Sequence, residues 1–407
     1  MRSEVKPNPY LAVIAGGKGT RLFPISTSEK PKPFCLLPNG RTFIQETVQR
    51  FYATGVKSSH VIVVVTDDHQ RQLAKDQLLS MGVLSQNIIS IPSFYGYAGA
   101  MVAATEFISK LNENAVIVNT PADQYIDDIT HFKAAINVGI RTARNVGPTI
   151  VGVKVNDLDT FIGCGHASYD PKASGIFYRV TGFVEKPDKE TANTLMRAGN
   201  TACNTGINIW KAKDLLNVVG TNELKQAHAE LKTNELMKRF KEIYLHVGKF
   251  DWHDCGTLKA FYDICKDKTP NHYNVSLGGN VYRTDCRRSL FITIPNVDLY
   301  VTGARDSAVV VNVIDGELYF AAVKLSESQS VGILAEDYER NKGILGYRFA
   351  QNCSNYKLVH TNISDEIGYG FYCIDNITLA VVKRPDGKFT AIVEISDDAR
   401  SNNRKAS

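Results

Sequence analysis

The stretch Leu11–Ser26, LAVIAGGKGTRLFPIS, decides the fold of this 407-residue chain. Its first five residues form an apolar run of the length of a buried β-strand, and the run leads into Gly16, Gly17 and Gly19. Glycines at this point let the backbone approach phosphate oxygens and leave N–H groups free to donate hydrogen bonds. A buried strand followed by such a loop therefore predicts a phosphate-binding turn at the carboxyl end of a strand.

Two common glycine motifs do not fit this loop. A P-loop requires G-x-x-x-x-G-K-S/T, and here Lys18 is followed by Gly19. A dinucleotide fingerprint requires a third glycine, where this chain has Leu22. What remains is a glycine turn with a fixed cation, Arg21. Such a turn suits a triphosphate that is attacked at its α-phosphorus, because charge develops on the phosphate oxygens and must be neutralised.

Apolar strands and amphipathic helices alternate along the first 265 or so residues. Strands are expected at 11–15, 61–66, 88–91, 115–119 and 149–153, and helices at 42–52, 68–81, 98–111 and 129–144. This alternation predicts an α/β domain with a doubly wound, mostly parallel sheet. After about residue 267 the pattern changes to short β-like runs separated by turn signals, which predicts a β-rich C-terminal domain. Its strand spacing is compatible with β-helix coils or a small barrel.

Composition excludes several classes of protein. The net charge of +5 is small and no long basic block occurs, so nucleic acid is not an expected partner. No apolar run approaches the roughly 20 residues of a membrane span, and the start, MRSEVKPNPY, lacks the apolar region of a secretory signal. The eight cysteines contain no C-x-x-C pair, which favours reduced thiols. We therefore expect a cytoplasmic protein without a membrane partner.

The glycine stretch, together with KPKPF at 30–34, resembles the signature of the sugar-1-phosphate nucleotidyltransferases, and most of all the mannose-1-phosphate guanylyltransferases. Further stretches resemble that family in the same chain order: PADQ (121–124), FIGCGHASYD (161–170), FVEKP (183–187), NTGINIW (204–210), DWHDCGTLKAF (251–261) and NVYRTDCRRSLFI (280–292). The resemblance implies a Rossmann-like catalytic domain over residues 1–267. It also implies a β-helical segment over 268–330, which would be a short left-handed β-helix. Residues 331–407 are then a β-rich extension of unassigned role.

The metal ligands are predicted from carboxylates. Asp123 follows a buried strand at the ligand-binding edge of the expected sheet, although it could instead cap the next helix. Mg²⁺ prefers carboxylate oxygens and would hold the phosphates of a nucleotide. Asp251 and Asp254 compete as the second ligand, and the resemblance selects Asp254.

The resemblance also assigns the remaining site residues. It gives catalysis to Arg21 and Lys32, with Lys32 contacting the triphosphate. It gives nucleotide binding to Ala15, Gly16, Gly17, Gly19, Thr20 and Gly99, and sugar-phosphate binding to Gly165, Glu185, Lys186 and Asn204. Glu185 and Lys186 could alternatively form an ordinary surface ion pair.

The expected reaction joins a nucleoside monophosphate from an NTP to a sugar-1-phosphate and releases pyrophosphate, with GTP and mannose-1-phosphate as the favoured pair. The chain departs from the family in two places: YGYAGAMVAA (95–104) stands where the guanylyltransferases carry R-N-T-A-P-A, and Gln124 replaces a histidine. Another base, or a heptose or glucose phosphate, is the alternative, as is a regulatory paralogue that binds a sugar nucleotide without turnover. The β-rich C-terminal region is a candidate contact for a homo-oligomer.

Overall fold

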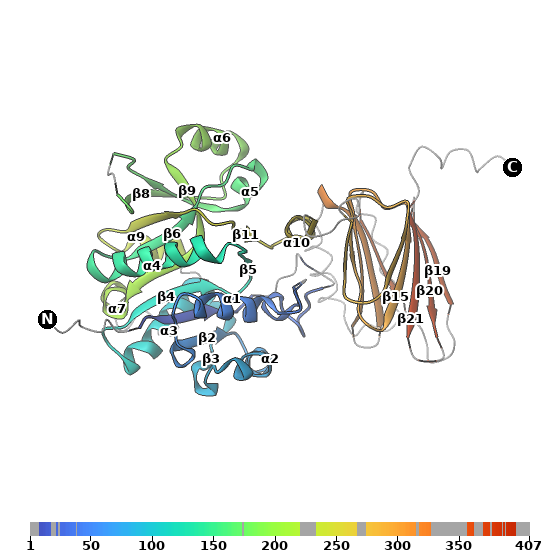
Figure 1. The fold of residues 1–407 in the computed structure, drawn as a ribbon, viewed down its shortest axis with the longest axis horizontal. Coiled ribbons are helices and arrows are strands. Elements are labelled where there is room, and N and C mark those ends of the chain that lie inside the picture. The colour runs from blue at the N-terminus through green and yellow to red at the C-terminus, as the bar shows by residue number, and fades with distance from the viewer. Residues whose placement is uncertain are drawn as a thin grey trace. The chain divides into compact units, whose positions relative to one another are not determined.

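The computed structural model describes residues 8–17, 22, 25–37, 39–172, 175–219, 233–266, 274–314, 317–326, 356–361, 369–374, 377–384, 386 and 388–395. The chain divides into two units (Figure 1). The first comprises Met1–Gly17 with Arg41–Asp254, and the second Lys18–Gly40 with Cys255–Ser407. The boundaries expected at residues 267 and 330 lie outside the described residues. No helix in the described ranges is long and apolar enough to cross a membrane.

The first unit is built on a nine-stranded sheet. In spatial order its strands are β3 (Ile88–Ser90), β2 (Val61–Val65), β1 (Tyr10–Ile14), β4 (Val116–Pro121), β9 (Thr201–Lys211), β6 (Thr149–Val153), β10 (Tyr244–Gly248), β8 (Tyr178–Glu185) and β7 (Gly165–Tyr169). The helices are α1 (Phe43–Tyr52), α2 (Asp68–Leu78), α3 (Gly96–Leu111), α4 (Ile129–Asn145), α5 (Leu158–Gly163), α6 (Lys189–Ala198), α7 (Ala212–Val219) and α9 (Thr233–Lys238). The α/β class expected from the sequence is confirmed.

The expectation of a mostly parallel sheet holds for only part of it. Strands β3, β2, β1 and β4 run parallel, and so do β6 and β10. The long strand β9, however, runs antiparallel to β4, β6 and β7, and β8 runs antiparallel to β7 and β10. Short connections can join antiparallel neighbours, whereas parallel neighbours need a crossover. The sheet is therefore mixed, with a parallel half that carries the glycine turn.

Local sequence explains why the helices begin where they do. Thr42 accepts a hydrogen bond from the N–H of Gln45 while the Gln45 side chain accepts from Thr42 N–H, which is a complete capping box. The carboxylates of Asp67 and Asp128 cap α2 and α4 by accepting from the backbone N–H three residues further on. The largest fully buried side chain is Trp210 on β9, whose indole N–H donates to Thr105 Oγ1 of α3 at 3.2 Å. Helix α3 also packs on β2 and on β1, the strand that leads into the glycine loop.

The second unit contains two five-stranded sheets. One has the order β12 (Val275–Leu277), β14 (Leu290–Ile292), β16 (Ser307–Ile314), β17 (Glu317–Lys324) and β18 (Tyr356–Thr361). The other has the order β13 (Val281–Thr284), β15 (Val297–Thr302), β21 (Phe389–Ile395), β20 (Ile377–Lys383) and β19 (Tyr369–Ile374). Side chains of both sheets share one apolar core, which includes Phe291, Leu299, Phe320 and Val393. The β-rich second domain expected from the sequence is confirmed.

The first strands of this unit stack in a regular way. Val281 pairs with Leu299, Leu290 with Ala308 and Arg287 with Arg305, all in parallel. Polar contacts between the stacked turns also join residues 18 apart in sequence, as between Arg288 and Asp306. The later strand pairs β16–β17, β17–β18, β19–β20 and β20–β21 are antiparallel. Parallel stacking is therefore confined to the early turns and to the pairing of β15 with β21.

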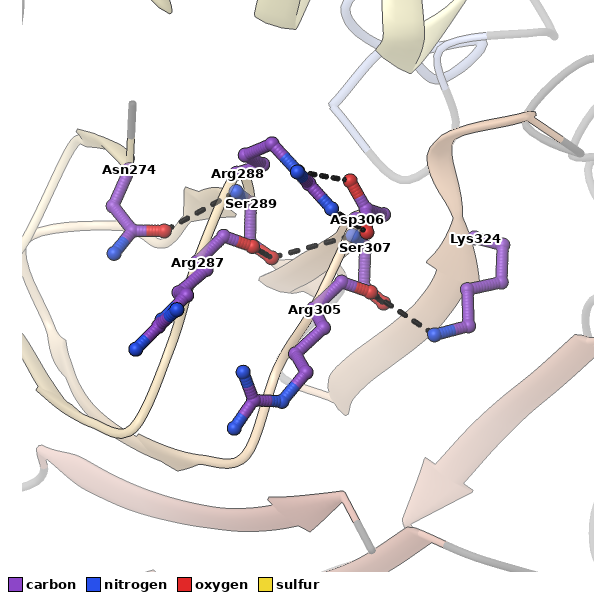
Figure 2. Close-up of polar contacts among 8 residues, drawn as sticks. All are labelled: Asn274, Arg287, Arg288, Ser289, Arg305, Asp306, Ser307 and Lys324. Atoms are coloured by element: carbon purple, nitrogen blue, oxygen red, sulfur yellow. Dashed lines mark hydrogen bonds and ion pairs between the residues drawn. The ribbon is translucent and has the colours of Figure 1, made fainter. Parts of the chain in front are cut away.

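A row of polar side chains ties the stacked turns together (Figure 2). Asn274 Oδ1 accepts from Ser289 N at 3.2 Å, and Ser289 Oγ accepts from Ser307 N at 3.2 Å. All three side chains are buried. At the surface Arg288 makes a bidentate contact with Asp306, at 2.6 and 2.7 Å. The row satisfies backbone groups that the turns would otherwise bury without partners.

We expect Asn274→Ala to destabilise the second unit. The change removes the acceptor of Ser289 N–H and the donor that reaches Cys286 O at 2.7 Å, and an unsatisfied buried group costs about 1–3 kcal/mol. Urea unfolding should show this loss of unfolding free energy. The matched control is Asn280→Ala, which removes an exposed Asn–Asp contact and should change stability by less than about 0.5 kcal/mol. Equal losses in the two variants would contradict a structural role for the buried row.

Candidate active site

The two predicted metal ligands lie next to each other. Strand β5 (Gln124–Tyr125) pairs antiparallel with β11 (His253–Asp254), and the register places Asp254 opposite Gln124. Asp123 directly precedes Gln124, so the backbone positions that carry Asp123 and Asp254 lie close together. Mg²⁺ usually takes one or two protein carboxylates and fills its remaining positions with water and substrate phosphates. Such a pair of carboxylates fits that ion, and no cluster of three or more metal-binding side chains occurs in the described ranges.

Strand β9 carries a bulge close to these carboxylates. Opposite β6, Ile207 pairs with Val151 and Asn204 pairs with Gly152, so Thr205 and Gly206 bulge out of the ladder. Gly206 has φ +76°, and a Cβ at this position would lie 2.8 Å from Pro121 Cγ. Asn204 Oδ1 accepts a hydrogen bond from Gly206 N at 2.9 Å. The amide oxygen of Asn204 thus shapes the bulge, which we define as residues 204–206.

Three side-chain hydrogen bonds join the bulge to other elements. Thr205 Oγ1 donates to Val151 O at 2.6 Å, while Gln124 Nε2 donates to Thr205 O. The hydroxyl of Tyr97, at the start of α3, donates to Gly206 O at 3.0 Å. Burial and the negative charge of Asp123 raise the pKa of Tyr97 well above its usual value, so this phenol stays protonated and remains a donor. The bulge is thereby fixed next to Asp123.

Three of the predicted sugar-phosphate residues, Gly165 on β7, Glu185 on β8 and Lys186 directly after it, form a second group, whereas Asn204 lies in the β9 bulge. Gly165 pairs with Glu185 across these strands, and a Cβ on Gly165 would lie 2.5 Å from Glu185 Oε2. Asn234 Nδ2 also donates to Glu185 Oε2 at 3.1 Å. Lys186 has φ +41°, a left-handed conformation that is costly for a residue with a side chain, and its N–H donates to Cys164 O at 3.1 Å. The backbone therefore holds Lys186 in one strained orientation after β8.

Cys203 connects the two groups. It pairs with His166 of β7 and directly precedes the bulge. A hydrogen bond with the Cys164 thiol and burial raise the pKa of Cys203 far above its usual value, and the charges of Asp254 and Glu185 add to the rise. Both carboxylates therefore lie close enough to act on this thiol. Asp254, one candidate metal ligand, and Glu185 therefore lie near the same segment of β9.

Residues 11–270, more than half of the chain, match the family model described as nucleotidyl transferase. The chain belongs to the nucleotidyl transferase family. The resemblance seen in the sequence motifs is thereby confirmed.

Two relatives show how far the similarity of this nucleotidyl transferase extends. The alginate biosynthesis protein AlgA of Pseudomonas syringae pv. tomato is 30% identical over 205 residues, which are 50% of this chain and 42% of the relative. A mannose-1-phosphate guanylyltransferase of Escherichia coli is 30% identical over 207 residues, 50% of this chain and 43% of the relative. The match thus spans less than half the length of these relatives.

One solved structure shows the same fold. It is described as a mannose-1-phosphate geranyltransferase from Thermus thermophilus and has a TM-score of 0.67 at 22% identity. The likeness covers 82% of this chain and 100% of that chain.

The glycine loop of this nucleotidyl transferase is described in part. Ala15 N donates to Val64 O at 2.8 Å, and a Cβ on Gly16 would lie 2.8 Å from Thr66 Cγ2, so the strand end fits closely against β2. Gly17 has φ +127°. The predicted residues Gly19, Thr20 and Arg21 lie outside the described residues. Lys32 begins the buried 3₁₀ helix η2 (Lys32–Phe34) of the second unit, and its role at the triphosphate stays a prediction.

The sequence did not identify the side chains that hold the bulge. In the sequence, Gln124 and Tyr97 stand out only because both lie where the chain departs from the family, Tyr97 within YGYAGAMVAA (95–104). Helix α3 does begin at the expected YGYAGA stretch, where a Cβ on Gly99 would lie 2.7 Å from Tyr95 Cβ. Gly99 therefore lets Tyr95 pack against the first turn, a reason for glycine that is independent of any nucleotide.

Proposed function

We propose that this chain is a sugar-1-phosphate nucleotidyltransferase that joins a nucleoside monophosphate from an NTP to a sugar-1-phosphate. The observation that supports the proposal is the pairing of β5 with β11, in which Asp254 lies opposite Gln124, the neighbour of Asp123, while Gln124 also donates to the β9 bulge. The Gly165–Glu185 pair and the strained Lys186 lie on the adjoining strands. A metal-binding carboxylate pair beside polar and cationic groups suits two anionic substrates held side by side.

The chemistry requires positioning and charge neutralisation. An oxygen of the sugar phosphate attacks the α-phosphorus in line, the bond to the β-phosphate breaks, and pyrophosphate leaves with the bonding electrons. The attacking oxygen is already ionised near pH 7, so no protein base is needed. Asp123 and Asp254 would hold Mg²⁺, which supplies positive charge at the phosphates. Arg21, Lys32 and Lys186 would supply further positive charge.

GTP and mannose-1-phosphate are the favoured substrates. Support comes from the 30% identical relatives, one of which is named a mannose-1-phosphate guanylyltransferase. Helix α3 lacks the Arg-Asn pair of the guanylyltransferases, so its first turn offers tyrosines and backbone amides to a base instead. A heptose or glucose phosphate, another base, or sugar-nucleotide binding without turnover are the alternatives.

The second unit has a proposed structural role. The 18-residue offset between its parallel turns supports a short left-handed β-helix at the start of residues 268–330, although β16 and β17 within that range pair antiparallel, and residues 331–407 would be an extension. Such a region would present a contact for a homo-oligomer. None of the six cysteines described in full forms a disulfide bond, which supports a reducing, cytoplasmic setting.

Purified protein should release pyrophosphate from GTP in the presence of mannose-1-phosphate and Mg²⁺. A panel of GTP, ATP, dTTP, UTP and CTP against several sugar-1-phosphates tests this directly. We expect GTP to be preferred by less than about a thousandfold in kcat/KM, or about 4 kcal/mol, because the Arg-Asn pair is absent. No release with any pair, alongside measurable sugar-nucleotide binding, would instead support the regulatory alternative.

Asp123→Asn and Asp254→Asn should each raise the Mg²⁺ concentration needed for half-maximal activity. A neutral amide is a poorer ligand than a carboxylate for a hard cation. Asp251→Asn is the matched control, because Asp251 precedes the β5–β11 ladder rather than lying in it. An equal shift in Asp251→Asn, or no shift in one of the other two variants, would argue against a shared metal site.

Gly165→Ala should weaken sugar-phosphate binding without unfolding the protein. The new methyl group would displace only the end of the Glu185 side chain, and losing a hydrogen bond to a charged group costs about 1.5–3 kcal/mol, or about tenfold or more in KM. Gly163→Ala is the control, since nothing lies within 4 Å of an added Cβ there. The role assigned to Glu185 would fail if both variants kept the wild-type KM for the sugar phosphate.

A further inference from the structure

The β9 bulge depends on side chains for its position. In the described ladders of β9 with β4, β6 and β7, neither Thr205 nor Gly206 has a paired residue. A strand segment outside its ladder is not fixed by the regular backbone hydrogen bonds. The donors that reach its carbonyl oxygens therefore determine where the bulge lies.

Tyr97 is the donor that comes from the nucleotide side of the site. It is the second residue of α3, and its hydroxyl reaches Gly206 O across 109 residues of sequence. The same carbonyl accepts a second hydrogen bond, at 2.9 Å, from Asn208 Nδ2 within β9 itself. Asn208 belongs to the strand that carries the bulge, so only Tyr97 of these two donors relates the bulge to another element.

Three segments meet at this hydroxyl. A Cβ on Gly206 would lie 2.8 Å from Pro121 Cγ, at the end of β4, and 3.7 Å from Tyr97 Oη. Asp123 follows Pro121 by two residues and acts electrostatically on Tyr97. The phenol thus lies where the first turn of α3, the candidate metal carboxylate and the bulge converge.

We propose that Tyr97 is a positioning residue that sets the bulge, and with it Asn204, relative to the metal carboxylates and to the nucleotide helix. The inference rests on the proposed function for its catalytic consequence and on geometry alone for the positioning. The hydroxyl does not touch the reacting atoms. It fixes the distance between the segment that receives the sugar phosphate and the segment that receives the nucleotide, so its loss lowers the fraction of bound pairs that are aligned.

Tyr97→Phe is the direct test, and Tyr52→Phe is its matched control. Tyr52 also donates its hydroxyl to a backbone carbonyl, Met81 O at 2.9 Å, and lies on α1 away from the bulge. Both variants lose one phenol–carbonyl hydrogen bond, so their melting temperatures should fall by similar amounts. Only Tyr97→Phe should lower kcat/KM for the sugar-1-phosphate, by about 2- to 10-fold. Its KM for GTP should stay within about twofold, because the helix itself is unchanged.

Hydrogen exchange provides a readout that does not depend on activity. In Tyr97→Phe the peptide covering residues 201–211 should exchange its amide protons faster than in the wild type, whereas in Tyr52→Phe it should not. Unchanged exchange and unchanged kinetics in Tyr97→Phe would overturn the proposal. Faster exchange in a protein whose wild type releases no pyrophosphate would leave the positioning role standing and reject the proposed function.

Discussion

The backbone pairing of Gln124 with Asp254 is the interaction on which the site depends. It brings the carboxylate of Asp254, from the end of the first unit, to the end of the parallel half of the sheet. Gln124 is held from two further directions: its carbonyl accepts from Arg50 Nη2 of α1 at 3.3 Å, and its side chain donates to Thr205 O. One buried residue therefore links the strand that carries Asp254, the helix after the glycine loop and the bulge. A fixed framework of this kind suits catalysis that proceeds by positioning and charge.

Backbone strain has different meanings in the two units. In the second unit the left-handed residues Asp285, Arg288 and Asp306 lie at stacked turns, and Arg288 and Asp306 are bonded to each other at 2.6 and 2.7 Å. Their conformation is part of a repeated structural pattern. Lys186 has the same conformation at a single place, after the strand that carries Glu185. Lys186 lies outside these repeated turns and carries a positive charge. Backbone strain of this kind is typical of residues that bind a ligand.

Local pattern was enough to predict strands β1, β2, β3, β4 and β6 and helices α1 to α4, whereas the candidate metal ligand Asp254 came from the family resemblance. Apolar runs and capping residues act over a few positions, and the motif order selected Asp254 over Asp251. The antiparallel direction of β9 and the contacts of Tyr97 and Gln124 could not be read in this way. They join residues 109 and 81 apart in sequence, and no local periodicity records such contacts. The unusual residues at 95–104 and 124 were visible, but only the fold shows that two of them hold the same bulge.

The contacts of α3 also bear on base recognition. Tyr95 packs on Gly99, and the Tyr97 hydroxyl donates to Gly206 O. Neither of these contacts is therefore arranged around the edge of a base. The N–H of Gly96 donates to Ser93 O, so the polar groups that this turn would offer to a base are mainly the backbone N–H groups that follow it, which a helix leaves without intrahelical partners. Backbone N–H groups donate but do not accept, so they can bind guanine O6 and cannot accept from its N2 amino group. This turn would therefore discriminate between guanine and other bases less strongly than a turn with both donor and acceptor side chains. The reason is that a wrong base would leave fewer of its polar groups unpaired.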